Sequence, residues 1–331
     1  MTTQFRGWRV HKRNGTTEAV LETLRENDLG VGTVTIQAEY SSLNYKDALA
    51  LTGKGKIMHR FPLVAGIDVA GRVADSDDPR FSVGDPVLVT GCGLGEDTDG
   101  GFAEYVRVAA EHVIPIPRGL DARSAMQLGT AGFTVGLAIE RLEHNGLRAG
   151  CGQIAVTGAS GGVGALAVAM LAQCGYHVMA LTSGADAYDW LKDLGAAEVL
   201  DSLEPGFGER ALESARYAGA IDTVGGDLLA RLLPVIDWWG SVAAIGNAGG
   251  AEFTATVYPF ILRGISLLGV NSVATPRLLR SQVWKRLANE LRPHKLDSIA
   301  AHEIALADVM EAAEDLIAGS GPRGRTLIRI H

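Results

Sequence analysis

The chain has 331 residues, enough for two domains, and its 47% apolar and 21% charged residues are typical of globular proteins. Thirty Lys and Arg residues against 38 Asp and Glu residues give a net charge of −8, with no basic block. The composition therefore excludes nucleic acids and anionic membrane surfaces as expected partners.

Neither a secretion signal nor a membrane anchor is expected. The first residues lack an apolar signal-peptide core, and no uninterrupted apolar run reaches the roughly 18 residues of a membrane span. The three cysteines, Cys92, Cys151 and Cys174, are odd in number and far apart, which fits neither a disulfide framework nor a cysteine-rich zinc motif. A reducing, cytoplasmic setting suits them best.

Residues 1–120 are predicted to form a partly open β-barrel. Residues 31–40 partly alternate between apolar and polar, as a half-buried strand does. Further strands are predicted over 63–73, which glycines interrupt, and at the end of 81–89, after a Gly-Asp turn. Many short strands with Gly and Pro between them are typical of such barrels.

Strands and helices alternate after residue 120, following helices predicted over 121–126 and 129–142. This alternation indicates βαβ units on a parallel sheet. Its strands are predicted over 154–157, 176–182, 198–200, 219–224, 241–246 and 265–270, and its helices over 163–174 and 187–194. Amphipathic helices over 281–291 and 306–318 precede a last strand, 324–330, which we expect to return to the first domain.

Residues 156–164, with the sequence VTGASGGVG, form the most informative motif. They connect a predicted buried strand to a predicted helix, so that free N–H groups and the positive end of the helix dipole can bind a phosphate. The spacing is neither Gly-x-Gly-x-x-Gly nor that of a Walker loop, because no Gly-Lys-Ser/Thr follows. The motif favours a dinucleotide over a hydrolysed nucleotide; the alternative is a glycine-rich turn without a ligand.

The end of the second strand bears on the choice between NAD and NADP. An acidic residue there would accept a hydrogen bond from the ribose 2′-OH of NAD. This chain has Thr182, Ser183 and Gly184 there. The hydroxyls of Thr182 and Ser183 can donate to a 2′-phosphate, although no basic residue adjoins them and Asp186 is close. The absent acid favours NADP; the alternative is that Thr182 and Ser183 only cap the following helix.

Seven segments occur together in one order: 41–47 (SSLNYKD), 52–56 (TGKGK), 66–68 (GID), 129–134 (GTAGFT), the glycine-rich loop, 219–225 (GAIDTVG) and 259–263 (PFILR). Together they resemble the zinc-independent medium-chain dehydrogenase/reductases of the quinone oxidoreductase type, most closely the acrylyl-CoA reductase subfamily. The resemblance implies an α/β protein with a GroES-like β-barrel catalytic domain (1–123 and 295–331), a Rossmann NADP-binding domain (124–294) and a cleft between them.

The resemblance also implies a cytoplasmic, dimeric enzyme that uses NADPH to reduce the C=C bond of an α,β-unsaturated carbonyl, such as that of acrylyl-CoA. Two alternatives stay open: a reductase of quinones or small enones, and an NADPH-binding protein without turnover. No metal is expected, since zinc-dependent relatives carry Gly-His-Glu where this chain has Gly66-Ile67-Asp68 and Cys92 has no nearby Cys partner.

Tyr45 and Asn44 are the candidate catalytic residues that the resemblance supplies. The Tyr45 phenol could stabilise the substrate oxygen or pack against the nicotinamide. Asn44 could hold the substrate or only its own turn. Asp47 is expected to fix that loop, and Asp68 to be buried and paired. The cofactor-binding residues implied are Tyr45, Ser160, Gly161, Gly162, Val163, Thr182, Ser183, Asn247, Leu267 and Arg325.

The chain departs from the subfamily where substrate and cofactor are recognised. Cys92 replaces a Trp, Asp97-Thr98-Asp99 stands in place of Asn-His-Trp, Gly184 replaces an Arg, and Asn271 replaces an Asp. The added acids could weaken the binding of anionic CoA esters. A basic cluster, Lys54, Lys56, His59 and Arg60, could contact CoA phosphates or form a solvated loop.

Overall fold

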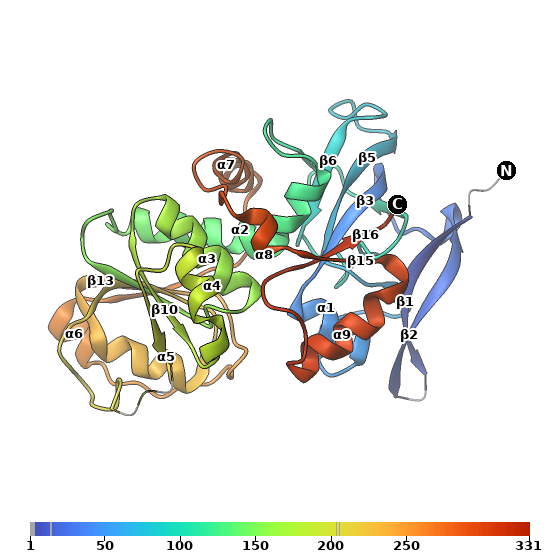
Figure 1. Cartoon of the computed structure of the whole chain (residues 1–331). Coiled ribbons are helices and arrows are strands. Elements are labelled where there is room, and N and C mark those ends of the chain that lie inside the picture. The colour runs from blue at the N-terminus through green and yellow to red at the C-terminus, as the bar shows by residue number, and fades with distance from the viewer. Residues whose placement is uncertain (1–3, 14, 203, 205) are drawn as a thin grey trace. The chain divides into compact units, whose positions relative to one another are not determined.

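The computed structural model describes residues 4–13, 15–202, 204 and 206–331, which divide into two compact units. The first unit extends to Thr130 and includes Val273–Gln282 and Ala300–His331, while the second comprises Ala131–Ser272 and Val283–Ile299 (Figure 1). The chain leaves the first unit after Thr130 and returns to it finally at Ala300.

The segment Val273–Gln282 belongs to the first unit, whereas the sequence had placed it in the second. Two buried or half-buried arginine contacts explain this. Arg280 donates a hydrogen bond to the carbonyl of Thr90 at 2.6 Å, and Arg277 donates to the carbonyl of Glu111 at 2.7 Å. These guanidinium groups hold the segment against the strands and loops of the first unit.

The first unit contains two sheets. The smaller has the order β2-β1-β4 and the larger the order β15-β16-β3-β5-β6-β8, with β7 also paired to β3. Their strands are β1 (Gln4–Arg13), β2 (Thr16–Arg25), β3 (Val34–Leu43), β4 (Leu63–Val64), β5 (Asp68–Ser76), β6 (Pro86–Thr90), β7 (Tyr105–Val108), β8 (Ile114–Pro115), β15 (His302–Ala305) and β16 (Thr326–Arg329). Strand β16 pairs antiparallel with β3, so the predicted return of the chain to the first domain is confirmed.

One predicted strand, 63–73, is divided into β4 and β5. Gly66 lies between them with φ of +102°, a left-handed conformation that favours glycine. A Cβ at Gly66 would lie 2.6 Å from the Phe102 ring. The chain bends here because Gly66 lets it pass close to buried Phe102, and β5 then starts at Asp68.

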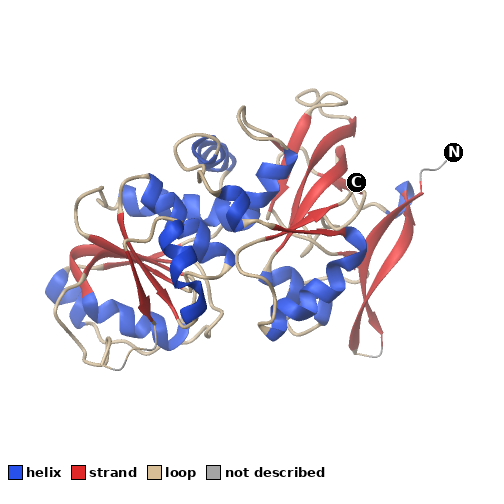
Figure 2. Ribbon diagram, viewed as in Figure 1, coloured by secondary structure: helices blue, strands red, loops and turns tan. Residues whose placement is uncertain are grey.

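The second unit contains a six-stranded parallel sheet with the strand order β11-β10-β9-β12-β13-β14. Numbered along the chain, this is the order 3-2-1-4-5-6 of a dinucleotide-binding Rossmann fold, as predicted. The strands are β9 (Gln153–Thr157), β10 (His177–Thr182), β11 (Glu198–Asp201), β12 (Tyr217–Asp222), β13 (Ile236–Ala244) and β14 (Ser266–Gly269). Helices α3 and α4 lie on one face of this sheet and α5 and α6 on the other (Figure 2).

Nine α-helices connect these strands among the described residues. They are α1 (Tyr45–Thr52), α2 (Ala122–His144), α3 (Gly162–Gln173), α4 (Tyr188–Asp193), α5 (Gly226–Leu232), α6 (Tyr258–Arg263), α7 (Arg277–Leu287), α8 (Leu296–Ile299) and α9 (Val309–Ala318). None of them combines the length and the apolar character that crossing a membrane requires.

Candidate functional site

The glycine-rich loop joins β9 to α3 through a turn that has no room for side chains. Gly158 has φ of +58°, and a Cβ there would lie 2.4 Å from Thr223 Oγ1. A Cβ on Gly164 would lie 2.2 Å from the Gly158 carbonyl oxygen. The loop is therefore tight because its glycines allow strand and helix to approach, as in dinucleotide-binding turns. Its predicted pyrophosphate residues, Ser160, Gly161, Gly162 and Val163, are exposed or half-buried.

A buried carboxylate anchors this loop to the neighbouring strand β12. Asp222 Oδ1 accepts a hydrogen bond from Thr157 Oγ1 at 2.6 Å, and Asp222 Oδ2 accepts one from the Gly225 amide at 2.9 Å. Thr223 Oγ1 donates to the Thr157 carbonyl at 2.8 Å. Burial raises the pKa of Asp222. Asp222 and Thr157 are supporting residues that the sequence did not reveal, since their pairing joins positions 65 residues apart.

A pocket of about 320 Å³ opens at the carboxyl ends of these strands. It is lined by Gly158, Ser160, Thr182, Ser183, Ser202, Val224, Gly225, Asp227, Leu228 and Gly249. The structure thus brings three predicted cofactor residues, Ser160, Thr182 and Ser183, to one pocket. Asn247 and Leu267 are not among its described lining residues: Asn247 is exposed after β13, and Leu267 is half-buried within β14.

Hydroxyl groups dominate the β10 side of the pocket. Thr182 Oγ1 lies 2.9 Å from Ser160 Oγ and accepts a hydrogen bond from the Gly184 amide at 3.2 Å. Thr182 is buried, whereas Ser183 is exposed. Ser202 directly follows β11 and also lines the pocket. Ser202 was not predicted as a site residue, although its place after the third parallel strand was a usable signal.

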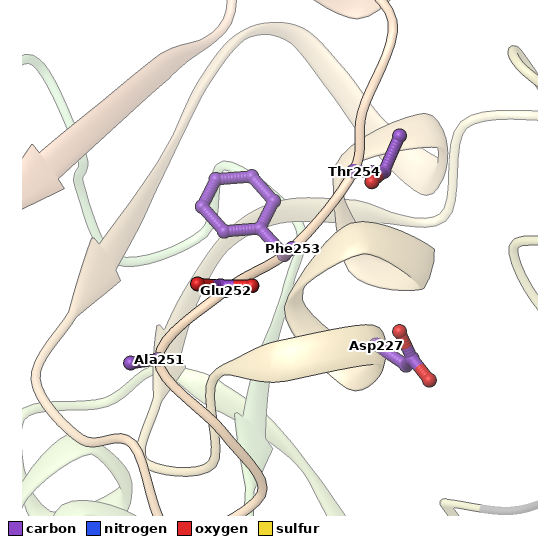
Figure 3. Close-up of a pocket in the computed structure, with 5 residues that line it drawn as sticks. All are labelled: Asp227, Ala251, Glu252, Phe253 and Thr254. Atoms are coloured by element: carbon purple, nitrogen blue, oxygen red, sulfur yellow. The ribbon is translucent and has the colours of Figure 1, made fainter.

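A second, larger hollow adjoins this pocket, because Asp227 lines both. Its volume is about 510 Å³, and its lining residues are Asp227, Ala251, Glu252, Phe253 and Thr254 (Figure 3). Two carboxylates therefore line this hollow, and no lysine or arginine is among its described lining residues. The surroundings of the pocket at Asp227 are acidic.

In the first unit, Asn44 and Asp47 organise the start of helix α1. The Asp47 Oδ2 atom accepts hydrogen bonds from the Asn44 backbone amide at 2.9 Å and from Asn44 Nδ2 at 3.1 Å. Its Oδ1 atom accepts one from the Ile67 amide at 2.9 Å. These bonds tie the first turn of α1 to the loop before β5, and they confirm that Asp47 fixes this loop.

Asp68 is the centre of a buried polar network that continues from Asn44. Its Oδ2 atom accepts hydrogen bonds from Ser42 Oγ at 2.7 Å and from Asn44 Nδ2 at 2.8 Å, while its Oδ1 atom accepts one from Thr130 Oγ1 at 2.6 Å. The Arg325 guanidinium lies 3.9 Å from Asp68 Oδ2. Asp68 is fully buried, so this cation and these donors compensate a carboxylate that water does not reach.

Arg325 completes the network from the loop before β16. It donates to Asn44 Oδ1 at 2.9 Å, to Ser42 Oγ at 2.7 Å and to the Leu43 carbonyl at 3.2 Å. Only 4% of Arg325 is exposed. The guanidinium of Arg325 therefore binds residues of the first unit. Its contact with the cofactor, which the resemblance implies, stays a prediction.

Gly129 makes room for this network inside helix α2. Its φ of +52° interrupts the helix, and a Cβ there would lie 2.6 Å from Ser42 Oγ and 2.7 Å from Asp68 Oδ2. The interruption frees the Thr130 amide, which donates to Asp68 Oδ2 at 3.0 Å. The carboxylate of Asp68 thus caps the helix that restarts after Gly129.

The two candidate catalytic residues are placed differently. Tyr45 is the first residue of α1 and is 46% exposed, so its side chain is accessible to a ligand. Asn44 is 9% exposed, and both ends of its amide are engaged, with Asp47, Asp68 and Arg325. Asn44 therefore positions Tyr45 and α1, and the structure does not leave its amide free for a substrate.

The Asp47 carboxyl makes the free energy of unfolding depend on pH. Burial, together with the nearby negative charge of Asp68, raises its pKa to about 7 from an ordinary 3.8. The folded chain then holds a proton between about pH 4 and pH 7 that the unfolded chain has lost, so stability falls as the pH rises through this window. We expect this group to lower the free energy of unfolding by roughly 2–3 kcal/mol between pH 5 and pH 8.

Urea unfolding of wild type and Asp47→Asn at several pH values measures this effect. The amide stays neutral, so the variant should lose most of the slope. Asp189→Asn, at an exposed position of α4, is the matched control and should keep it. An unchanged slope in Asp47→Asn would show that Asp47 is ionised throughout the range.

The chemistry of the site does not fit a zinc ion. Zinc sites need several converging Cys, His or carboxylate ligands. Among the residues that the structure describes, no three such side chains are grouped to hold a metal. Asp68 is surrounded by hydrogen-bond donors and by the Arg325 guanidinium.

Asp97 and Asp99 lie against the basic cluster of Lys54, Lys56, His59 and Arg60. Asp97 Oδ1 lies 2.7 Å from His59 Nδ1, and the Asp97 carbonyl accepts a hydrogen bond from Arg60 Nε at 2.6 Å. Asp99 lies 3.8 Å from the Arg60 guanidinium and accepts a hydrogen bond from the Val64 amide. The segment that carries these acids thus partly neutralises the cluster, while Lys54 and Lys56 stay exposed.

Comparison with known proteins agrees with the two units. The model of the alcohol dehydrogenase GroES-like domain matches residues 30–118, and that of the zinc-binding dehydrogenase family matches residues 162–291. The chain is 48% identical to the probable acrylyl-CoA reductase AcuI of Escherichia coli, over 97% of this chain and 98% of that protein. It is 43% identical to the putative quinone oxidoreductase YhfP of Bacillus subtilis over the full length of both.

Solved structures show the same likeness. The structure of E. coli YhdH with bound NADPH has a TM-score of 0.94 at 47% identity and covers 98% of this chain and 100% of its own. B. subtilis YhfP with NAD bound has a TM-score of 0.96 at 43% identity, covering 99% and 100%. The predicted fold is thereby confirmed, and the chain belongs to the medium-chain dehydrogenase/reductase superfamily, among the oxidoreductases related to acrylyl-CoA reductases and quinone oxidoreductases.

Proposed function

We propose that this protein uses NADPH to reduce the C=C bond of an α,β-unsaturated carbonyl, with an acyl-CoA such as acrylyl-CoA as substrate. The observation that carries the cofactor assignment is the glycine-rich turn beside the hydroxyl-lined pocket of the second unit. The full-length likeness to a probable acrylyl-CoA reductase supports the reaction. Relatives hold NADPH in one structure and NAD in another, and the absent acid after β10 favours NADPH.

The reaction adds two electrons and two hydrogens to the double bond. When bound, NADPH supplies a hydride to the β-carbon, and the α-carbon takes a proton. Residues Ser160 to Val163 would hold the pyrophosphate through backbone amides, and Thr182 and Ser183 the adenosine ribose. The Tyr45 phenol would donate a hydrogen bond to the carbonyl oxygen as negative charge develops there. No metal takes part in this proposal.

A second candidate function is the reduction of quinones or small uncharged enones. The contacts of Asp97 and Asp99 with His59 and Arg60 favour it, because they weaken the positive field that would attract CoA phosphates. The likeness to a putative quinone oxidoreductase agrees with this alternative. The third reading, an NADPH-binding protein without turnover, finds less support, since the Tyr45 side chain is accessible to a substrate.

The loss of NADPH absorbance in the presence of acrylyl-CoA, crotonyl-CoA, a quinone and a simple enone distinguishes these functions. The first proposal expects turnover with the CoA esters, and turnover with the small enones or quinones alone would replace it by the second. No oxidation of NADPH with any of them would favour the binding protein. Tyr45→Phe should lower kcat by roughly 10-fold or more, as loss of a transition-state hydrogen bond does.

We also propose that the protein is a homodimer in the cytoplasm. Large apolar side chains are exposed on β13 and α6, including Trp238 (64%), Trp239 (80%) and Ile261 (69%). Strand β14 is an edge of the six-stranded sheet and offers unpaired backbone groups. An apolar patch beside an open edge is suited to a second copy of the chain. Light scattering of the purified protein tests this assembly.

A further inference from the structure

Helix α1, which begins at Tyr45, is too short to hold its own geometry. It has 8 residues, and isolated helices of this length are unstable in water. Successive residues of an α-helix point roughly 100° apart around its axis, so the side chains of Tyr45, Lys46 and Asp47 leave the first turn in three directions. The direction of the Tyr45 phenol therefore depends on what holds the two residues that follow it.

Asp47 holds the inner side of this first turn. Its side chain is buried, and its carboxylate accepts hydrogen bonds from the backbone amides of Asn44 and Ile67, each at 2.9 Å. Ala48 and Leu51, further along the helix, are buried as well. These contacts fix the buried side of α1, and a second anchor on another side of the turn is needed to fix its rotation about the helix axis.

Lys46 supplies this second anchor. Its ammonium lies 3.1 Å from Glu96 Oε1, and the side chains of Lys46 and Glu96 are only 34% and 13% exposed. Because the pair is half-buried, water screens it less than it screens a surface ion pair. The contact joins positions 50 residues apart and ties the first turn of α1 to the segment 91–99.

The segment 91–99 holds Glu96 firmly. The Glu96 amide donates a hydrogen bond to the Gly93 carbonyl at 3.1 Å, and the Glu96 carbonyl accepts one from the His59 amide at 3.0 Å. The side chain of Leu94, two residues before Glu96, is 1% exposed and belongs to the core of the first unit. The carboxylate of Glu96 is therefore a fixed point against which Lys46 is held.

We propose that the Lys46–Glu96 ion pair orients the Tyr45 phenol for the reaction. Asp47 holds one side of the first turn of α1 and the ion pair holds another, so that the phenol keeps one direction although it is 46% exposed. Lys46 and Glu96 are positioning residues and are assigned no contact with the substrate. This inference rests on the proposed function, in which the phenol donates a hydrogen bond to the developing oxyanion, and a misplaced donor stabilises that charge poorly.

Steady-state kinetics of Glu96→Gln test the pair, because the amide keeps the size of the side chain and removes its charge. We expect kcat to fall by about 5-fold or more and KM to stay within about 2-fold, as for a donor that acts mainly in the transition state. Lys46→Arg keeps the cation and should retain most of kcat. Glu18→Gln is the matched control: the Glu18 carboxylate lies 3.2 Å from the Arg13 guanidinium, both side chains are more than half exposed, and its loss should change neither constant.

Fluorine NMR of protein labelled with 3-fluorotyrosine reports on Tyr45 without turnover. The Tyr45 resonance is the one that Tyr45→Phe lacks. In Glu96→Gln it should narrow and shift toward that of free fluorotyrosine as the ring becomes more mobile, whereas Glu18→Gln should leave it in place. A wild-type kcat in Glu96→Gln would overturn the inference and leave the proposed function intact. If wild type oxidises NADPH with none of the substrates, the proposed function fails, and an unchanged Tyr45 resonance in Glu96→Gln would then overturn the inference as well.

Discussion

Replacing Arg325 with Met is expected to destabilise the protein by about 3–5 kcal/mol, the usual cost of leaving a buried charge without its partner. The guanidinium is almost fully buried and binds Ser42, Leu43 and Asn44 as well as lying near Asp68. Methionine keeps much of the volume and none of the donors. Asp68 would then keep its hydrogen bonds from Ser42, Asn44 and Thr130 but lose its ion pair with Arg325.

Arg329→Met is the matched control for this experiment. Arg329 lies on β16, four residues further along, with its side chain 59% exposed and 3.5 Å from Glu303. Exposed ion pairs contribute about 0–1 kcal/mol, so this variant should unfold in urea close to wild type. Equal urea midpoints for the two variants would show that the buried network does not stabilise the fold. Because the network also holds Asn44, Arg325→Met should lower kcat with any substrate that wild type reduces.

The second unit could be predicted in detail because its information is local. Strands β9, β10 and β12 are largely apolar and are followed by Gly158, Ser183 and Thr223, and the loop at 156–164 marks the first crossover by itself. Right-handed crossovers restrict how such strands can be ordered, and the resemblance supplied the Rossmann arrangement. The pocket residues at the end of β10 follow from the same order, because carboxyl ends of parallel strands meet at one edge.

The first unit could be predicted only in outline, since its decisive contacts join distant positions. Arg325 and Leu43 are separated by 282 residues, and Thr130 and Asp68 by 62. No periodic pattern indicates which buried charges meet, so the sequence pointed to a buried, paired Asp68 without naming its partners. The sequence predicted two helices, 121–126 and 129–142, and the structure interrupts helix α2 at Gly129, where a side chain would collide with Ser42 and Asp68.

The β1–β2 hairpin was missed as well, although Asn-Gly at 14–15 is a hairpin signal. Its strands carry charged residues at many positions and lack the apolar alternation on which the prediction relied. Residue 14 itself lies outside the described residues. The Asn-Gly pair therefore indicates a hairpin, but the polar residues on both sides of it did not predict strands.

Gly164→Ala is expected to abolish useful dinucleotide binding, weakening the affinity for NADPH by about 100-fold or more, because it separates the loop from the helix that follows. The added methyl would lie 2.2 Å from the Gly158 carbonyl oxygen and 2.7 Å from Ala159 Cα, both of them backbone atoms that cannot rotate away. Either the loop or the first turn of α3 must move. Overpacking of this kind also costs about 1–3 kcal/mol of stability.

Gly269→Ala is the matched control, because it also replaces a glycine of the second unit but lies outside the glycine-rich loop. Gly269 ends β14 in the same unit, has no left-handed φ, and offers a Cβ no contact within 4 Å. The affinity of the Gly269→Ala variant for NADPH should match that of wild type. Fluorescence titration is done after circular dichroism has shown each variant to be folded, so that binding is compared between folded proteins. If folded Gly164→Ala binds NADPH as wild type does, the glycine-rich loop is not what holds the pyrophosphate, and the dinucleotide assignment must move elsewhere in the second unit.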